Sequence, residues 1–156
     1  MHANDFLNPE LNDRQHILVV DDDRYIRQLN REILTSHGFE VTVALDGLAA
    51  WDELQQNHYD LLITDNDMPG LSGMGLIRRL HEAHLTLPVI MVTGSSPHAE
   101  LARQPELHVE ALLLKPYTLD ELLHAVKNVL LMSNSGQAAV QPGLPPPFPA
   151  VLPPLE

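Results

Sequence analysis

The chain has 156 residues, of which 21 are Asp or Glu and 9 are Lys or Arg, so its formal net charge is −12 with histidine neutral. This length fits one domain of ordinary size with a short appendage, and the absence of cysteine excludes disulfides, thiolate metal sites and cysteine nucleophiles. The acidic charge excludes the basic surface that binds nucleic acid and favours cations or basic partners. No apolar run is long enough for a membrane span, and the N-terminus lacks the pattern of a signal peptide, so we expect a cytoplasmic protein.

Composition divides the chain into three segments. Residues 1–14 are polar and predict an irregular lead-in, whereas residues 15–132 carry the apolar patterns of a folded domain. Residues 133–156 contain seven of the thirteen prolines and a single charged residue, Glu156. Because proline lacks a backbone N–H and fixes φ, this last segment predicts an extended or disordered tail or linker.

Strand-like and helix-like patterns alternate within residues 15–132. Short β-branched and apolar runs, such as 17–20 and 61–64, are typical of strands covered on both faces. In chain order the pattern predicts strand 17–20, helix 25–34, strand 41–44, helix 48–54, strand 61–64, helix 74–80, strand 88–92, helix 98–103, strand 111–114 and helix 119–130. This alternation predicts a doubly wound α/β fold, in which helices cover both faces of a five-stranded parallel sheet.

Polar residues follow four of the five predicted strands. The carboxyl ends of parallel strands lie along one edge of the sheet, and ligands bind beyond that edge where the strand order reverses. We therefore expect these polar side chains to lie close together. In chain order they are Asp21, Asp22, Asp23, Asp65, Asp67, Thr93 and Lys115.

Each of these residues also has an ordinary structural interpretation. The aspartate triplet can be a solvated turn that begins a helix, Thr93 can be a turn or cap residue, and Lys115 can be a surface charge. Carboxylates that converge at one crevice, however, repel one another unless a cation or a proton intervenes. Oxygen ligands without nearby His or Cys suit Mg²⁺, so we consider a magnesium site at this edge.

Together these groups describe the chemistry of phosphoryl transfer. An ionised Asp65 carboxylate can attack phosphorus and form an acyl phosphate without a strong base. Mg²⁺ and Lys115 can neutralise the transferred group, and the Thr93 hydroxyl can donate a hydrogen bond to one of its oxygens.

Four stretches of the sequence resemble the receiver domain of two-component response regulators. They are ILVVDDD at 17–23, LLITDNDMPGLSG at 61–73, VIMVTG at 89–94 and LLKPY at 113–117. Each is short, but all four stand in the family's order, and each lies at the end of a predicted strand. The resemblance covers about residues 14–132 and implies a flavodoxin-like (βα)5 receiver fold.

The resemblance implies a role for each residue of the phosphoryl site. Asp65 is the phosphoacceptor, Thr93 is the switch hydroxyl, and Lys115 contacts the phosphoryl group. Pro116 would follow a cis peptide bond, which proline makes accessible. A sensor histidine kinase or a histidine phosphotransfer protein would supply the phosphoryl group. The domain would be a signalling module that catalyses only its own phosphorylation and dephosphorylation.

The resemblance also implies a set of Mg²⁺ ligands. Asp21 and Asp22 form the acidic pair, with Asp22 the more direct ligand, and Asp65 completes the carboxylates. Asp67 would contribute its backbone carbonyl. Asp23 is an extra carboxylate that we expect to begin the first helix.

One position departs from the family pattern. Receiver domains usually carry Tyr or Phe three residues before the lysine, where the ring moves inward with the threonine on phosphorylation. Here that position is Leu112, and Tyr117 lies on the other side of Lys115. The phosphorylation chemistry is expected to survive this change, whereas output is expected to use a different movement.

Two alternatives and the output stay open at this point. A phosphohydrolase of the haloacid-dehalogenase type would also use an Asp-x-Asp motif such as 65–67, but that family places its nucleophile strand first. A receiver-like interaction module that needs no phosphorylation is disfavoured by the intact acidic set and Lys115. The output would be a downstream protein or an effector domain beyond residue 156, and homodimer formation is open.

Overall fold

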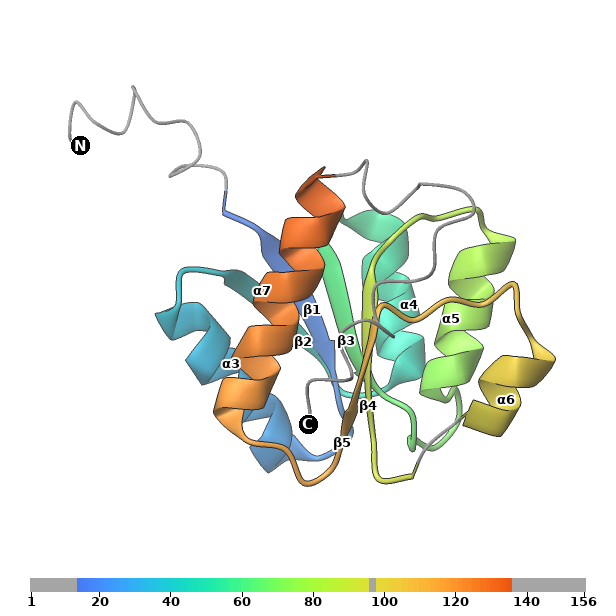
Figure 1. Cartoon of the computed structure of the whole chain (residues 1–156), viewed down its shortest axis with the longest axis horizontal. Coiled ribbons are helices and arrows are strands. Elements are labelled where there is room, and N and C mark those ends of the chain that lie inside the picture. Colours follow the sequence, from blue (N-terminus) through green and yellow to red (C-terminus); the bar gives the residue numbers. More distant parts are fainter. Residues whose placement is uncertain (1–13, 96–97, 136–156) are drawn as a thin grey trace, which may run out of the picture.

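A computed structural model of the protein describes residues 14–95 and 98–135, and in these residues five strands alternate with five helices (Figure 1). The strands are β1 (His16–Val20), β2 (Glu40–Ala44), β3 (Leu61–Asp65), β4 (Val89–Thr93) and β5 (Ala111–Leu114). The helices are α3 (Arg24–Ser36), α4 (Gly47–Gln56), α5 (Gly73–Glu82), α6 (His98–Arg103) and α7 (Leu119–Ser135). The alternation predicted from the sequence is confirmed.

All five strands are parallel and lie in the order β2-β1-β3-β4-β5. The strand order reverses between β1 and β3, which is where an open parallel sheet forms a crevice beyond its carboxyl edge. The register pairs Val20 with Thr64, and Asp65 with Val92. The residues that end β1, β3 and β4 therefore lie side by side.

Helices cover both faces of the sheet, as a doubly wound fold requires. In Figure 1, α3 and α7 lie on one face, and α4, α5 and α6 lie on the other. Alternate residues of one strand enter different cores: Ile17 and Val19 of β1 pack with α7, whereas Leu18 and Val20 pack with α4 and α5. The strands β3 and β4 are buried along their whole length, so the surrounding core holds their carboxyl ends in place.

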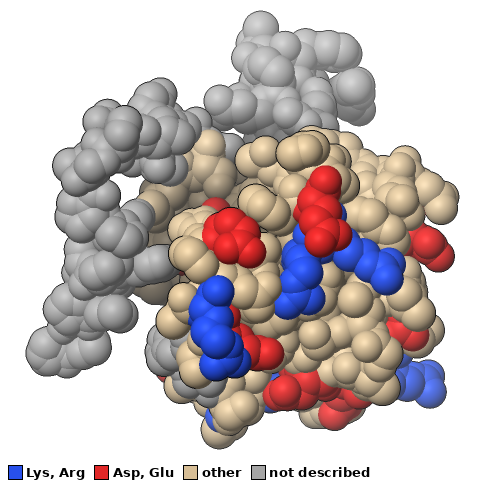
Figure 2. Space-filling model, turned by 90° about the vertical axis from the view of Figure 1, so that its right-hand side faces the viewer, with Lys and Arg blue, Asp and Glu red and all other residues tan. Residues whose placement is uncertain are grey.

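On the outer face over α5 and α6, the described residues include both acidic and basic side chains (Figure 2). Figure 2 views the molecule from this side, and the acidic and basic side chains there are interspersed among uncharged residues. On this side Arg78 of α5 donates two hydrogen bonds to the Gln104 side chain, at 3.1 and 2.9 Å, just beyond α6. None of the helices in the described part of the chain combines the length and apolar character that a bilayer span requires.

The first helix begins as the sequence predicts. Asp23 is the N-cap of α3, and its Oδ1 accepts hydrogen bonds from the backbone N–H groups of Tyr25 at 2.9 Å and Ile26 at 3.3 Å. These bonds satisfy two of the amides that a helix start leaves unpaired. Because Asp23 is used in this way, Asp21 and Asp22 are the members of the triplet that remain for a site.

The last helix continues past the predicted end of the domain. α7 reaches Ser135, whereas the sequence placed the start of the tail at residue 133. Apolar spacing continues through Leu131 and Met132, and none of the next three residues is a proline or glycine that would end a helix. The predicted lead-in, apart from Arg14, and the proline-rich part of the tail lie outside the described residues.

The start of α5 packs directly on the end of β3. A Cβ added to Gly73 would lie 2.6 Å from the backbone oxygen of Asp65 and 2.9 Å from the Cα of Asn66, which is closer than real atoms approach. Glycine at this position lets the helix meet the strand end without displacing it.

We expect Gly73→Ala to lower the free energy of unfolding by about 1–3 kcal/mol, because the backbone around Asp65 must shift to admit the methyl group. Denaturant unfolding measures the change. Gly94→Ala is the matched control, since a Cβ there meets nothing within 4 Å. An equal loss in the two variants would contradict the close approach.

Candidate functional site

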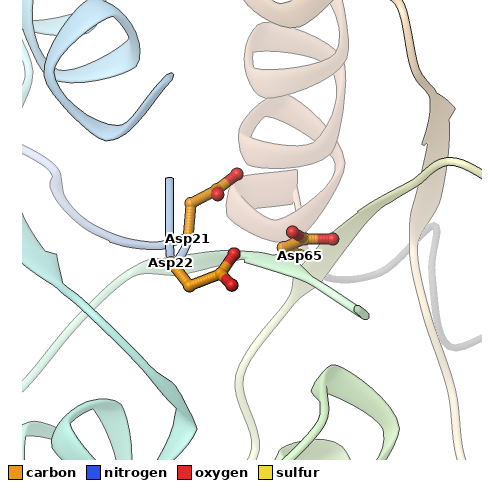
Figure 3. A group of neighbouring side chains, drawn as sticks. All are labelled: Asp21, Asp22 and Asp65. Carbon is orange, nitrogen blue, oxygen red and sulfur yellow. The ribbon is translucent and has the colours of Figure 1, made fainter. Parts of the chain in front are cut away.

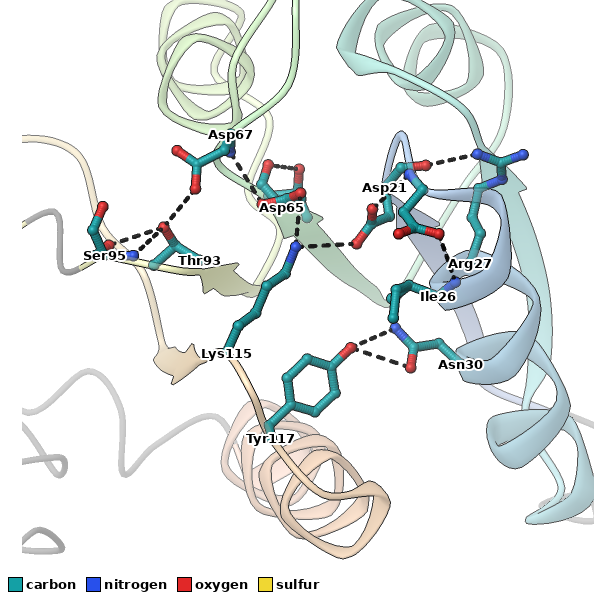
Figure 4. Close-up of polar contacts among 12 residues, drawn as sticks. Asp21, Ile26, Arg27, Asn30, Asp65, Asp67, Thr93, Ser95, Lys115 and Tyr117 are labelled. Carbon is teal, nitrogen blue, oxygen red and sulfur yellow. Dashed lines mark hydrogen bonds and ion pairs between the residues drawn. The ribbon is translucent and has the colours of Figure 1, made fainter.

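Four strand ends bring the predicted site residues together. Asp21 directly follows β1, Asp65 ends β3, Thr93 ends β4, and Lys115 directly follows β5. Figure 4 shows the Lys115 ammonium between the carboxylates of Asp65 and Asp21, and the Thr93 side chain turned toward Asp67 and Ser95. The structure thus brings together the predicted residues apart from Asp23, whose side chain caps α3.

Three carboxylates form the acidic part of the site. One oxygen each from Asp21, Asp22 and Asp65 lies within 4.8 Å of the others (Figure 3). Asp21 and Asp65 are only 3% and 2% exposed, whereas Asp22 is exposed. Burial raises the pKa of Asp21, and the charges of Asp65 and Asp22 add to this rise. The backbone N–H of Asp23 and the charge of Lys115 oppose it.

Lys115 supplies a positive charge that partly offsets this group. Its Nζ donates a hydrogen bond to Oδ2 of Asp65 at 3.1 Å and lies 3.9 Å from Oδ2 of Asp21. Partial burial lowers the pKa of Lys115, but the hydrogen bond to Asp65 and the charges of Asp21 and Asp65 outweigh this and raise the pKa overall. The side chain is therefore a charged ammonium held between two buried carboxylates.

The Thr93 hydroxyl has partners of its own, which the sequence did not reveal. Oγ1 of Thr93 is fully buried and lies 2.9 Å from the backbone oxygen of Ser95 and 3.2 Å from Oδ2 of Asp67. A hydroxyl has one proton, so these two oxygens compete for it, and Oγ1 also accepts from the Ser95 N–H at 3.2 Å. In this structure the hydroxyl is engaged by Asp67 and Ser95 rather than by Asp65.

The loop after β3 is held by its own backbone and side-chain bonds. The Asp67 N–H donates to Oδ1 of Asp65 at 3.0 Å, and Oδ1 of Asn66 accepts from the Met74 N–H at 2.9 Å. An open cavity of about 560 Å³ adjoins this loop. It is lined by Asn66, Asp67, Met68, Pro69, Ser72, Ser95 and Glu100.

Sequence reasoning missed the contacts of three residues near the site. Nη1 of Arg27 donates to the backbone oxygen of Asp21 at 2.8 Å. Asn30 of α3 and Tyr117, which follows the Lys115–Pro116 peptide bond, form hydrogen bonds with each other. The Lys115–Pro116 peptide bond is cis, as the resemblance implied.

The acidic group fits a small divalent cation. Its ligand atoms are all carboxylate oxygens, and no histidine or cysteine is among them. Hard oxygen donors of this kind, two of them buried, suit Mg²⁺, which binds through one or two carboxylates with water and phosphate oxygens. The same oxygens repel one another in the absence of a cation, since the Lys115 ammonium supplies only one positive charge against three negative ones.

The response regulator receiver domain family model matches residues 17–127. The chain belongs to this family. It is 40% identical over 109 residues to the sensor histidine kinase RcsC of Escherichia coli, which covers 70% of this chain and 12% of RcsC. It is 32% identical over 128 residues to the response regulator MprA of a Mycobacterium species, which covers 82% of this chain and 56% of MprA. This receiver domain thus spans only part of these curated relatives.

Solved structures of receiver domains share the fold. The receiver domain of Francisella response regulator 1452 matches with a TM-score of 0.70 and 29% identity, covering 77% of this chain and 99% of that one. The response regulator TrrA of Thermotoga maritima, solved in complex with Mg²⁺ and BeF, matches with a TM-score of 0.66 and 30% identity, covering 74% of this chain and 98% of that one. The flavodoxin-like (βα)5 fold expected from the resemblance is confirmed.

Leu112 has a packing role in this receiver domain. It lies on β5 opposite Met91 of β4 and packs against the core on the α4 and α5 face. A branched aliphatic side chain in that place has no ring to move inward with Thr93.

We expect Asp21→Asn to stabilise the metal-free protein at neutral pH. The pKa of Asp21 is raised on folding, so the native state binds a proton more readily than the unfolded state, and stability falls as the pH rises from the usual aspartate pKa through the native one. An asparagine carries no charge to bury.

We expect the variant's melting temperature at pH 7 to exceed that of the wild type by about 2–4 °C. This advantage should shrink as the pH falls through the raised native pKa toward the ordinary aspartate value of about 4, below which the carboxyl is protonated in both the native and the unfolded state. Asp22→Asn, at an exposed position, should change stability less. An advantage for Asp21→Asn that grows toward low pH would overturn this explanation.

Proposed function

We propose that this receiver domain accepts a phosphoryl group on the carboxylate of Asp65. The observation that carries the proposal is the hydrogen bond of 3.1 Å from Lys115 to a buried Asp65 whose oxygens also lie near those of Asp21 and Asp22. Such a carboxylate can act as an oxygen nucleophile. The ammonium beside it, and a metal cation bound by the neighbouring carboxylates, can neutralise the negative charge of the phosphorylated product.

The transfer needs no base in this site. An Asp65 oxygen forms a bond to phosphorus while the bond from phosphorus to the donor breaks, and the electron pair of that bond stays with the donor. Lys115 and Thr93 then bind oxygens of the acyl phosphate, and the Lys115 ammonium already lies within one hydrogen bond of the acceptor.

We assign the Mg²⁺ ligands to Asp21, Asp22, Asp65 and the backbone carbonyl of Asp67. When bound, Mg²⁺ supplies positive charge that offsets the phosphoryl oxygens. Asp21 is oriented for this purpose by two bonds: its Oδ1 accepts from the Asp23 N–H at 2.9 Å, and its carbonyl accepts from Arg27.

The proposed donor of the phosphoryl group is a sensor histidine kinase or a histidine phosphotransfer protein. The proposed output is a downstream protein or an effector domain beyond residue 156. This receiver domain resembles part of RcsC, itself named a sensor histidine kinase, and part of MprA, named a response regulator. Both names are those of signalling proteins in which such a domain is one part of a longer chain.

The added phosphoryl group would carry about −1.5 to −2 charges into the site. In the resting structure the Thr93 proton is shared between Asp67 and Ser95, so Thr93 must leave these partners to bind a phosphoryl oxygen. Since Leu112 offers no ring, we propose that this release acts on the loops after β3 and β4.

We expect Asp65→Asn to lose Mg²⁺-dependent labelling by acetyl phosphate, because an amide is not a nucleophile toward phosphorus. Intact-protein mass spectrometry measures the labelled fraction. Asp60→Asn is a matched control, since Asp60 is hydrogen-bonded to the His16 N–H at the opposite end of the sheet and should leave labelling unchanged. Equal labelling of Asp65→Asn and the wild type would refute the proposal.

The same experiment separates a receiver from a phosphohydrolase. We expect the label to saturate at one phosphoryl group per chain and to decay slowly. Rapid repeated turnover of a phosphomonoester would instead favour the haloacid-dehalogenase type of chemistry. Unlabelled protein that still engages its partner would favour an interaction module that needs no phosphorylation.

We expect Lys115→Ala to keep Mg²⁺ binding but to lose the conformational response to phosphorylation, because the variant has no ammonium at this position to form an ion pair with the phosphoryl group. Backbone amide shifts with and without beryllofluoride or acetyl phosphate measure the response. The control is Lys127→Ala, which changes the chain's other lysine, a residue of α7. A wild-type pattern of shifts in Lys115→Ala would contradict this role.

A further inference from the structure

A hydrogen-bonded pair beside the site has no role in the chemistry described so far. Asn30 lies on α3 and is only 3% exposed, and Tyr117 follows β5. The Asn30 amide nitrogen donates to the Tyr117 oxygen at 2.9 Å, and the Tyr117 hydroxyl donates to Oδ1 of Asn30 at 3.2 Å (Figure 4). The pair joins two segments that are 87 residues apart in the sequence.

We propose that Asn30 and Tyr117 are positioning residues that hold the Lys115 ammonium over Asp65 and Asp21, and that they thereby set the affinity of the site for its divalent cation. The proposal rests on the magnesium site of the proposed function. It assigns to these two residues no contact with the phosphoryl group.

The connection from the pair to Lys115 is short. Only Pro116 separates Tyr117 from Lys115, and a proline limits the backbone freedom of that connection. On its other side Lys115 is tied to β4, because its N–H donates to the Thr93 oxygen at 2.8 Å. A lysine side chain is long and flexible, so the place of its backbone decides where the ammonium can reach.

The helix α3 holds both partners of the charge contact. Arg27 of α3 donates to the backbone oxygen of Asp21, and Asn30, one helical turn later, holds Tyr117. The Asp21 carboxylate and the Lys115 ammonium, 3.9 Å apart, are thus anchored to the same helix from opposite sides. Breaking the Asn30 contact releases the lysine side while Arg27 keeps the aspartate side in place.

A purely structural explanation does not require these polar groups. A phenylalanine ring would fill the same space as Tyr117, and an aliphatic residue would avoid the cost of burying an amide at Asn30. Burial raises the pKa of Tyr117, and the charge of Asp21 adds to this rise while the hydrogen bond from Asn30 opposes it, so the hydroxyl stays protonated and able to donate.

The proposal predicts two effects of opposite direction. An ammonium held beside Asp65 and Asp21 repels a divalent cation that binds the same oxygens. A variant that frees Lys115 should therefore bind Mg²⁺ more tightly and yet accept phosphoryl groups more slowly. General loosening of the site would instead weaken Mg²⁺ binding.

Calorimetric titration of the full chain with MgCl₂ tests the proposal without any phosphoryl donor. We expect Lys115→Ala to tighten Mg²⁺ binding about fivefold, and Tyr117→Phe to tighten it by a smaller factor in the same direction. In the Lys115→Ala background, Tyr117→Phe should have no further effect, because the pair acts through the lysine. Asn30→Leu removes the other partner of the pair and should tighten Mg²⁺ binding in the same way. This variant also provides the test if Tyr117→Phe does not fold.

Tyr59→Phe is the matched control. Tyr59 is 5% exposed and donates its hydroxyl proton to Glu53 at the amino end of the sheet, so its loss should leave Mg²⁺ affinity unchanged. Unchanged or weaker binding in both pair variants, or an equal effect of Tyr117→Phe with and without Lys115, would overturn the proposal. If Asp65 is not labelled but this pattern of affinities holds, the phosphoacceptor assignment fails and the positioning role stands. A wild type that binds no Mg²⁺ overturns both.

Discussion

The repulsion among three carboxylates is the interaction on which the rest of this site depends. Asp21 and Asp65 are buried, and Asp22 brings a third oxygen within 4.8 Å of theirs. One ammonium, that of Lys115, only partly offsets this charge. The remaining imbalance favours a divalent cation, and we propose that it also prepares Asp65 as a nucleophile, so that the electrostatic cost of the resting site and its proposed reactivity have the same origin.

The fold sustains this cost because its sheet is rigid where the charges meet. β3 and β4 are buried along their length, and Gly73 allows α5 to pack against the backbone of Asp65. Hydrogen bonds also engage the side chains around the site: Asp67 and Ser95 share the Thr93 proton, and Asn30 donates to Tyr117, two residues after Lys115. On this account phosphorylation exchanges one set of hydrogen-bond partners for another, and Leu112 stays in the core.

The sequence predicts the strands and the main site residues because both follow from local rules. Apolar runs identify the strands, and parallel strands place the residues after them at one edge, so Asp65 and Lys115 could be paired without coordinates. Asn30 and Tyr117 could not, since their contact depends on how α3 and α7 pack across 87 residues. The contact of the Asp67 side chain with Thr93 could not be predicted for the same reason, and the sequence analysis gave Asp67 a role only through its backbone carbonyl. The last helix was predicted to end at residue 130, five residues before the end of α7, because its apolar pattern weakens gradually and no breaker stands at residue 133.

The most direct test of this account is to locate the cation. Manganese in place of magnesium broadens the amide signals of nearby residues in a ¹H–¹⁵N spectrum of the full chain. The account predicts that substoichiometric Mn²⁺ broadens first the signals of the loops that follow β1 and β3, around Asp22 and Asp67, and that excess Mg²⁺ restores them. Broadening spread over unrelated acidic surfaces, with those two loops unaffected, would contradict it.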